Sequence, residues 1–327
     1  MDDNTKAIHD SFMRMAEEFN TRRLCEIFGK AIMNDDFTNK MAEESLVVRM
    51  INELIYDQDK QFQINMPSDT VLFRARAVLD VSDFCTEKTG ISAGYVDAND
   101  NRGTPFVSTG FDKYGSKEAP MGKTPPARNN ISGMSYLYLA EDPYTACSEI
   151  RPYLRSIISL AQFKTKNELK LMDFSPADTV NPSSLMHLGE KLKPDGAPEN
   201  ISVRETIIWI MRQFAQTVGK SEQYRVSQYI SDYIRKTGFD GIRYSSSLTG
   251  GKNITLFNSH EANIQFVSSK LVYSLSQKYQ IMDINSGEQI PVVDNADEWN
   301  QERLNSIRIT IMQAVHQANS RNGNKAK

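Results

Sequence analysis

Hydrophobic positions near the start of the chain recur at helical spacing, and the pattern then changes to the alternation typical of strands. In residues 3–56 apolar side chains repeat three and four positions apart, which predicts two or three amphipathic helices. From residue 70 to residue 78 the chain is β-branched, aromatic and alternating, which predicts a strand. Shorter apolar runs predict further strands at 134–140, 156–163, 169–174 and 253–257, and amphipathic helices at 204–217 and 224–236.

The segments between these elements predict loops, and the end of the chain predicts a helical tail. Residues 83–127 and 175–200 are rich in glycine, proline and polar side chains, so we expect loops there. After residue 263 the pattern indicates short strands and then a long helix at about 298–318, whose polar end we expect to fray. Helices and strands together predict an α+β protein.

One stretch, residues 128–149, combines a strand, a turn and a short helix with polar residues at both ends. Its middle, 134–140, is aromatic and apolar and short enough for a buried strand. Asp142 is placed to cap the helix that follows, and Pro143 suits the first helical position. That helix carries Glu149, which we expect to face the same cavity as the residues at the start of the stretch.

Three arginines occupy positions where a charge calls for an explanation. Arg128 stands ahead of a polar, glycine-containing loop, where its planar fork can clamp a phosphate. Arg74 and Arg76 lie inside the predicted strand at 70–78, and a charge there is costly unless it is paired or faces a ligand.

Composition and charge exclude several classes of protein. The 327 residues are 39% hydrophobic and 24% charged, which is enough apolar material for a sizeable core. The net charge of −3 argues against direct nucleic-acid binding, which needs a basic face. The 3 cysteines are scattered and the 4 histidines lack ligand spacing, so neither a disulfide framework nor a metal site is predicted.

Targeting signals and common catalytic motifs are missing from the sequence. The polar N-terminus has no apolar signal region, and no apolar run is long enough to span a bilayer, so we expect a cytoplasmic protein without membrane contact. A G-x-G-x-x-G fingerprint, a P-loop and a G-x-S-x-G elbow are all absent. A hydride-transferring Rossmann enzyme is therefore not supported, and Cys147 has no histidine in its sequence context to make it a nucleophile.

Several short pieces of the sequence occur in an order that resembles the RES domain, a family named for its arginine, glutamate and serine. The likeness covers about residues 70–260. The pieces are F-R-A-R (73–76), P-P-A-R-N-N-I-S-G (125–133), L-Y-L-A-E-D-P-Y-T-A-C-S-E (137–149), L-M-D-F (171–174) and D-G-I-R-Y-S-S-S (240–247), followed by N-I-T-L-F (253–257). Members of the family act as bacterial toxins that pair with Xre-type antitoxins, and their fold is similar to that of ADP-ribosyltransferases.

The resemblance implies an enzyme that consumes NAD by cleaving its nicotinamide glycosidic bond, with water or phosphate as the acceptor. It implies catalytic roles for Glu149, for the strand arginine Arg74 and for the serine Ser246, which Ser245 and Ser247 flank as competitors. It implies that the dinucleotide is bound by Arg128, Tyr138, Arg76 and Asn129. NAD is then a substrate, and no metal is expected.

The chemistry of NAD explains why such residues are suited to the task. Nicotinamide leaves as a neutral amide and needs no general acid, while the ribose passes through an oxocarbenium-like state. The Glu149 carboxylate can stabilise that cation, and arginines can hold the pyrophosphate bidentately. Tyr138 offers a flat face to nicotinamide, and Ser246 can hydrogen-bond the ribose or the carboxamide.

Each of these residues also has a purely structural interpretation. Glu149 at a helix end is by default solvated or paired with Arg151, and Arg74 in a strand is equally consistent with a structural ion pair. Tyr138 is more often a core residue, and the serines are more often turn residues.

The chain divides by this reasoning into an N-terminal helical segment (1–65), a RES-like NAD-binding catalytic domain (66–265) and C-terminal strands with a long helix that packs on the core (266–327). The expected core is mostly antiparallel and ADP-ribosyltransferase-like.

An Xre-type antitoxin is the expected partner. The N-terminal helices could serve regulation or self-association as a homo-oligomer, and the sequence does not decide between these roles. Two alternatives remain open: a protein ADP-ribosyltransferase that uses the same cleft, and a nucleotide-binding module without catalysis.

Overall fold

The computed structural model describes two compact units, whose segments alternate along the chain. Unit 1 comprises residues 1–70, 118–145 and 164–265, and unit 2 comprises 71–117, 146–163 and 266–327. Within these units the structure describes residues 13, 15, 20–32, 46–56, 60–78, 93–95, 106–108, 110–154, 156–175, 202–215, 221–259, 263–274, 281–282 and 289–290.

The sheet of unit 1 is mixed but mainly antiparallel. Its strands lie in the order β1-β7-β8-β9-β5, with β7 and β8 parallel and the other neighbouring pairs antiparallel. Because β7 and β8 are parallel, their carboxyl ends lie at the same edge, beside the start of β9 and the end of β5. The strands are β1 (Gln63–Met66), β7 (Leu169–Phe174), β8 (Gly241–Ser245), β9 (Lys252–Leu256) and β5 (Leu137–Ala140).

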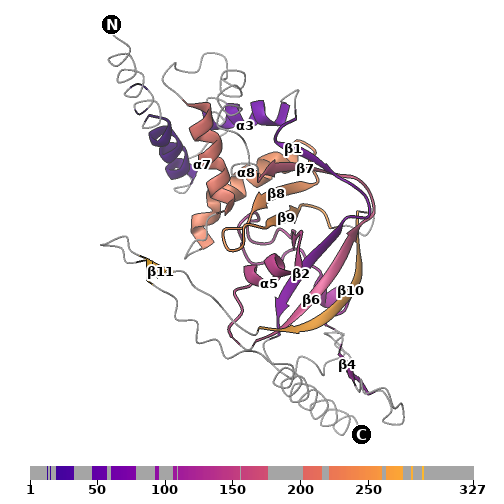
Figure 1. Cartoon of the computed structure of the whole chain (residues 1–327). Helices are drawn as coiled ribbons and strands as arrows, with labels where there is room; N and C mark the ends of the chain where they lie inside the picture. Colours follow the sequence, from indigo (N-terminus) through magenta and orange to yellow (C-terminus); the bar gives the residue numbers. More distant parts are fainter. Residues whose placement is uncertain are drawn as a thin grey trace. The chain divides into compact units, whose positions relative to one another are not determined.

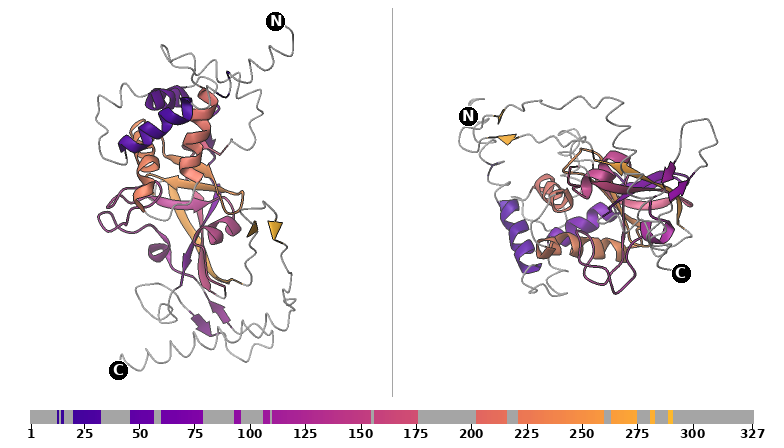
Figure 2. Two further views of the ribbon diagram at one scale, coloured as in Figure 1. Left: turned by 90° about the vertical axis from the view of Figure 1, so that its left-hand side faces the viewer. Right: turned by 90° about the horizontal axis from the view of Figure 1, so that it is seen from below.

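Helices cover one face of this sheet and form the main core with it (Figure 1). The two views of Figure 2 show these helices gathered beside the strands of unit 1. Met172, Phe174, Ile242 and Tyr244 point into this core, so the alternate strand residues Asp173 and Arg243 lie on the opposite face. The helices are the helical residues 20–32, α3 (Leu46–Tyr56), α7 (Val203–Ala215) and α8 (Arg225–Lys236), which follows the short 3-10 turn η3 (Ser221–Tyr224).

Most residues of three further strands, in the order β2-β6-β10, belong to unit 2. The strands are β2 (Val71–Ala77), β6 (Ile157–Thr165) and β10 (Ile264–Tyr273), and a single helical turn, α4 (Lys113–Ser116), packs against β2. The helix α5 (Pro143–Glu149) begins in unit 1 and ends in unit 2. Two further pairs of short strands are β3 (Ala93–Tyr95) with β4 (Phe106–Ser108) and β11 (Ile281–Met282) with β12 (Gln289–Ile290).

The α+β class with a mostly antiparallel sheet is confirmed. The predicted strands at 70–78, 134–140, 156–163, 169–174 and 253–257 correspond to β2, β5, β6, β7 and β9. The helical residues 20–32 and α3 share one core with α7 and α8, while the domain division at residue 65 stays a prediction. The polar segment 176–200 and the tail helix expected at 298–318 lie outside the described residues.

Candidate active site

The loop before β5 is held in one conformation by hydrogen bonds from its own side chains and from Tyr138. The Tyr138 hydroxyl accepts from the backbone N–H of Asn129 (3.0 Å) and donates to Oδ1 of Asn130 (2.7 Å). The Asn130 amide donates in turn to the carbonyls of Pro125 (3.0 Å) and Ile131 (3.1 Å). Burial raises the pKa of the Tyr138 hydroxyl well above its ordinary value, so it remains a neutral donor.

Arg128 lies in this loop between two tyrosine rings. Its guanidinium carbon is 5.4 Å from the centre of the Tyr244 ring on β8 and 5.9 Å from that of Tyr224 at the end of η3. Helix α8 holds the backbone on either side, because Gln228 donates to the Ala127 carbonyl (2.7 Å) and Ser227 donates to the Arg128 carbonyl (2.5 Å). Arg128 is 9% exposed, so it is a buried cation, and hydrogen bonds from α8 hold the backbone that carries it.

Asn129 is the most deeply buried of the predicted binding residues. It is 1% exposed, and its amide nitrogen donates to the Thr255 hydroxyl of β9 at 2.6 Å. Its Oδ1 is buried without a hydrogen-bond partner. A buried amide oxygen left in this state is costly, and such atoms in native proteins call for an explanation such as a bound water or ligand.

The start of helix α5 agrees with the capping pattern in the sequence. Asp142 accepts from the backbone N–H of Thr145 at 2.8 Å, and Pro143 is the first helical residue. Glu149 is the last residue of α5, half-buried, and follows Thr145 by one turn on the same side of the helix.

The serine-rich loop after β8 docks onto the first turn of α5. The hydroxyls of Thr249 and Thr145 are 2.8 Å apart, and Gly251 lies so close to Thr145 that a methyl group would have no room there. Ser246 is buried, and its hydroxyl accepts from the backbone N–H of Leu248 at 3.1 Å. The predicted serine therefore braces the loop in which it lies.

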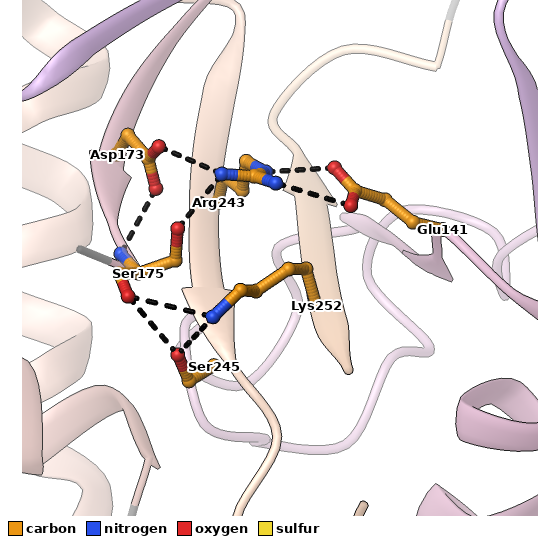
Figure 3. Close-up of polar contacts among 6 residues, drawn as sticks. All are labelled: Glu141, Asp173, Ser175, Arg243, Ser245 and Lys252. Atoms are coloured by element: carbon orange, nitrogen blue, oxygen red, sulfur yellow. Dashed lines mark hydrogen bonds and ion pairs between the residues drawn. The ribbon is translucent and has the colours of Figure 1, made fainter. Parts of the chain in front are cut away.

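A polar cluster that sequence reasoning missed lies on the sheet face opposite the helices (Figure 3). Arg243 forks onto both oxygens of Glu141 through Nε (2.7 Å) and Nη2 (3.1 Å). Its Nη1 donates to Asp173 Oδ2 and to Ser175 Oγ, both at 2.8 Å. Beside it, Lys252 donates to Ser245 Oγ at 2.9 Å. The sequence signal was a charged residue inside the apolar strand pattern of β8.

The electrostatics of this cluster favour the charged arginine. Burial alone would lower the pKa of Arg243, but hydrogen bonding and charge from Glu141 and Asp173 outweigh it and raise the pKa. The side chains of Arg243 and Asp173 are only 18% and 10% exposed. One cation therefore pairs with two carboxylates at the place where β5, β7 and β8 end.

Arg74 and Arg76 bind the peptide carbonyls at the end of α4 within unit 2. Nη1 of Arg74 donates to the carbonyls of Ser116 (2.5 Å) and Lys117 (2.7 Å). Nη1 of Arg76 donates to the Gly115 carbonyl, and its guanidinium lies 5.6 Å from the centre of the Phe111 ring. Both arginines thus complement the negative end of a helical turn.

The structure brings part of the predicted set together. Arg128, Asn129 and Tyr138 form one group in unit 1. Ser246 directly follows the end of β8 in the same unit. Glu149, Arg74 and Arg76 belong to unit 2, where the two arginines share the α4 turn. The roles predicted for these residues toward NAD stay predictions.

Neither a metal cluster nor a membrane helix is found among the residues that the structure describes. Within them, no group of three or more histidine, cysteine, aspartate or glutamate side chains could hold a metal ion. In the same described ranges, no helix has the length and apolar character needed to cross a bilayer.

Comparison with known proteins identifies the family of this α+β protein. A family model, the RES domain, matches residues 104–276, which include Arg128, Tyr138, Glu149 and Ser246. The match spans over half of the chain, and the chain therefore belongs to the RES domain family. Arg74 and Arg76 precede the matched residues.

Among solved structures, the chain is similar to one from the M. tuberculosis MbcT–MbcA toxin–antitoxin complex. The TM-score is 0.32 at 10% sequence identity, and the alignment covers 69% of this chain and 91% of that chain. No curated protein matches the chain.

Proposed function

We propose that the chain cleaves the bond between nicotinamide and ribose in NAD, with water or phosphate as the acceptor of the ADP-ribosyl group. Membership of the RES domain family carries this proposal, because the matched residues 104–276 contain an arginine, a tyrosine, a glutamate and a serine in the order expected for such an enzyme. The polar groups in unit 1 and at the end of α5 have chemistry that suits the reaction.

The Arg128 loop supplies a fixed positive charge for the pyrophosphate. The rings of Tyr224 and Tyr244 limit the positions open to the guanidinium, and Ser227 and Gln228 fix the backbone that carries it. A buried arginine held in this way loses little side-chain freedom when an anion binds. The interaction with a phosphate is also stronger where water is excluded.

Helix α5 and the serine-rich loop supply groups for the ribose. The Asp142 cap and the Thr145–Thr249 contact fix the start of the helix that ends in Glu149. The Glu149 carboxylate then stabilises the oxocarbenium-like state as the nicotinamide leaves with the bonding electron pair as a neutral amide. The acceptor attacks the ribose carbon and releases its proton to solvent, while the Ser246 hydroxyl orients the ribose.

The decisive experiment measures nicotinamide release from NAD by the purified chain, with and without phosphate. Replacing Glu149 by glutamine preserves shape and removes the charge, and we expect turnover to fall by about a hundredfold or more. Glu168→Gln is the matched control, because Glu168 is exposed in the β6–β7 turn, and it should retain the parent rate. Parental turnover in the Glu149→Gln variant would refute the assignment of Glu149.

Other outcomes separate the alternative functions. If the wild-type chain releases nicotinamide only when a protein acceptor is added, and labelled NAD marks that acceptor, the reaction is protein ADP-ribosylation. If it binds NAD and releases no nicotinamide under any condition, the chain is a nucleotide-binding module and our proposal fails. A phosphate-dependent rate would assign phosphate as the acceptor in place of water.

We further propose that the chain is a toxin restrained by an Xre-type antitoxin. Family membership is the basis, because members of this family pair with such antitoxins. Expression of the chain alone should arrest growth and deplete cellular NAD, and co-expression of its antitoxin should relieve both effects. Normal growth and normal NAD at high expression of the folded chain would contradict the toxin role.

A further inference from the structure

Arg243 joins three segments that leave the sheet of unit 1 at one edge. Glu141 directly follows β5, Asp173 and Ser175 lie at the end of β7, and Arg243 itself belongs to β8. To reach Glu141 the guanidinium must extend past β9, because β9 lies between β8 and β5 in the sheet. Figure 3 shows the arginine between its two carboxylates.

The first of these connections fixes the starting point of α5. Glu141 is bound through both carboxylate oxygens and also donates its backbone N–H to the Lys252 carbonyl at 3.0 Å. The next residue, Asp142, caps the helix. A bidentate arginine fork sets both distance and orientation, so it defines the direction in which the chain enters α5.

The second connection fixes the base of the serine-rich loop, residues 246–251. Ser175 receives a hydrogen bond from Arg243, and its carbonyl accepts from Ser245 Oγ at 3.3 Å. Lys252 donates to Ser245 and to the same Ser175 carbonyl (2.9 and 3.4 Å), which closes the loop at its other end. The loop that carries Ser246 is therefore held from both sides by the Arg243 cluster.

We propose that Arg243 is a positioning residue for the reaction: by binding Glu141, Asp173 and Ser175 together, it sets where α5 and loop 246–251 leave the sheet. The expected effect of Arg243 on catalysis rests on the proposed function. Its effect on the positions of α5 and loop 246–251 does not depend on that function. Lysine cannot replace the arginine, because a single ammonium group cannot engage both oxygens of Glu141 while it also reaches Asp173 and Ser175.

The test compares Arg243→Lys with Arg235→Lys, a control in which the arginine fork binds one carboxylate, Asp232, on α8. For Arg243→Lys we expect kcat for nicotinamide release to fall between about ten- and a hundredfold, with KM for NAD changed less than about threefold. Arg235→Lys should keep the parental kcat and KM. A loss confined to KM, or a parental kcat in Arg243→Lys, would overturn the inference.

Hydrogen exchange on the same variants tests the positioning without reference to activity. Arg243→Lys should speed exchange in α5 and in loop 246–251 and leave α8 unchanged. Equal acceleration in α8 would indicate general destabilisation and overturn the inference. If wild-type protein releases no nicotinamide, the proposed function fails, whereas the exchange pattern still decides the positioning role.

A second variant, Glu141→Gln, guards against poor folding of Arg243→Lys. It keeps the shape of the side chain and weakens the fork, so it should show the same pattern to a smaller extent. In the double variant the two losses in kcat should not add, because both changes remove the same contact. Full additivity would mean that the two residues act separately and would overturn the inference.

Discussion

The Tyr138 hydroxyl has a structural role in the loop that carries Arg128, and the predicted contact of its ring with nicotinamide stays a prediction. Sequence reasoning expects its ring to lie flat against nicotinamide. In the structure its hydroxyl joins the backbone of Asn129 to the side chain of Asn130, and the ring packs against the core. The hydroxyl therefore contributes to the shape of the loop that holds Arg128.

Removing the Tyr138 hydroxyl should weaken both the fold and the binding of NAD. Tyr138→Phe leaves the Asn129 N–H and Asn130 Oδ1 without their partner, at a cost of about 1–3 kcal/mol in unfolding free energy. Because the ring remains, its packing against the core is preserved, whereas the Arg128 loop loosens. We expect KM for NAD to rise about tenfold, which corresponds to about 1.4 kcal/mol.

Tyr233→Phe is the control for this change. Tyr233 donates a single hydrogen bond to Asn52 (2.8 Å) within the helical core, remote in sequence from the loop. The Tyr233→Phe change should lower the free energy of unfolding by about 1 kcal/mol and leave KM for NAD unchanged. A parental KM in Tyr138→Phe, measured from nicotinamide release, would show that the hydroxyl does not support the binding loop.

At the scale of elements, the contact between loop 246–251 and α5 depends on the absence of a side chain at Gly251. A methyl group there would overlap Thr145 Oγ1 and come within 2.7 Å of Asp142 Oδ2. These are the groups that dock the loop and cap the helix. The close approach ties the segment carrying Ser246 to the segment carrying Glu149.

Gly251→Ala should therefore destabilise the protein and reduce turnover together. We expect the free energy of unfolding, measured with urea, to fall by about 1–3 kcal/mol, as it does when a methyl group is forced into a well-packed site.

Gly29→Ala provides a control that should change stability in the opposite direction. Gly29 lies in a helix, and a methyl group there meets Trp209 and Val226 at ordinary distances of 3.6 and 3.7 Å. It should stabilise by about 0.5–1 kcal/mol. Parental stability in Gly251→Ala would contradict the close contact.

Across the whole molecule, buried tyrosines make stability depend on alkaline pH. Burial raises the pKa of Tyr136 and of Tyr229 to about 12, and it raises that of Tyr138 further. In the unfolded chain tyrosine loses its proton near pH 10. Between these values the unfolded state binds fewer protons than the folded state, so the unfolding free energy falls as pH rises.

Stability should be constant with respect to these groups below about pH 10 and decline above it. Urea unfolding at a series of alkaline pH values measures the decline, and Tyr229→Phe should make it shallower. A free energy of unfolding that stays level up to about pH 11 in the wild-type chain would show that these hydroxyls are not protected by burial.

Much of the fold could be predicted from the chain because local signals and tertiary packing agree. The short apolar run at 169–174 predicts β7, and Asp142 with Pro143 predicts the start of α5. The polar loop predicts binding roles for Arg128 and Asn129, which stay predictions, and both residues lie in one buried group with Tyr138.

The remainder depends on contacts between residues far apart in the sequence. Nothing near Arg128 indicates that Tyr224 and Tyr244 lie on either side of it, about a hundred positions later. Glu141 and Arg243 are separated by a similar distance and meet only because β9 pairs with both β5 and β8. The partners of Arg74 and Arg76 likewise come from a short helical turn that lies within the predicted loop at 83–127.

Because unit 1 is built from segments that are far apart in the sequence, its assembly depends on the order of synthesis on the ribosome. When residues 125–133 emerge, the strand and helix that hold Arg128 have not yet been made: Ser227 and Gln228 follow about a hundred residues later, and Thr255 later still. At about 5–20 residues per second, this gap lasts several seconds. A nascent or prematurely terminated chain therefore lacks the residues that hold the Arg128 loop. The loop can reach its final conformation only after Thr255 has been translated, nearly four-fifths of the way along the chain.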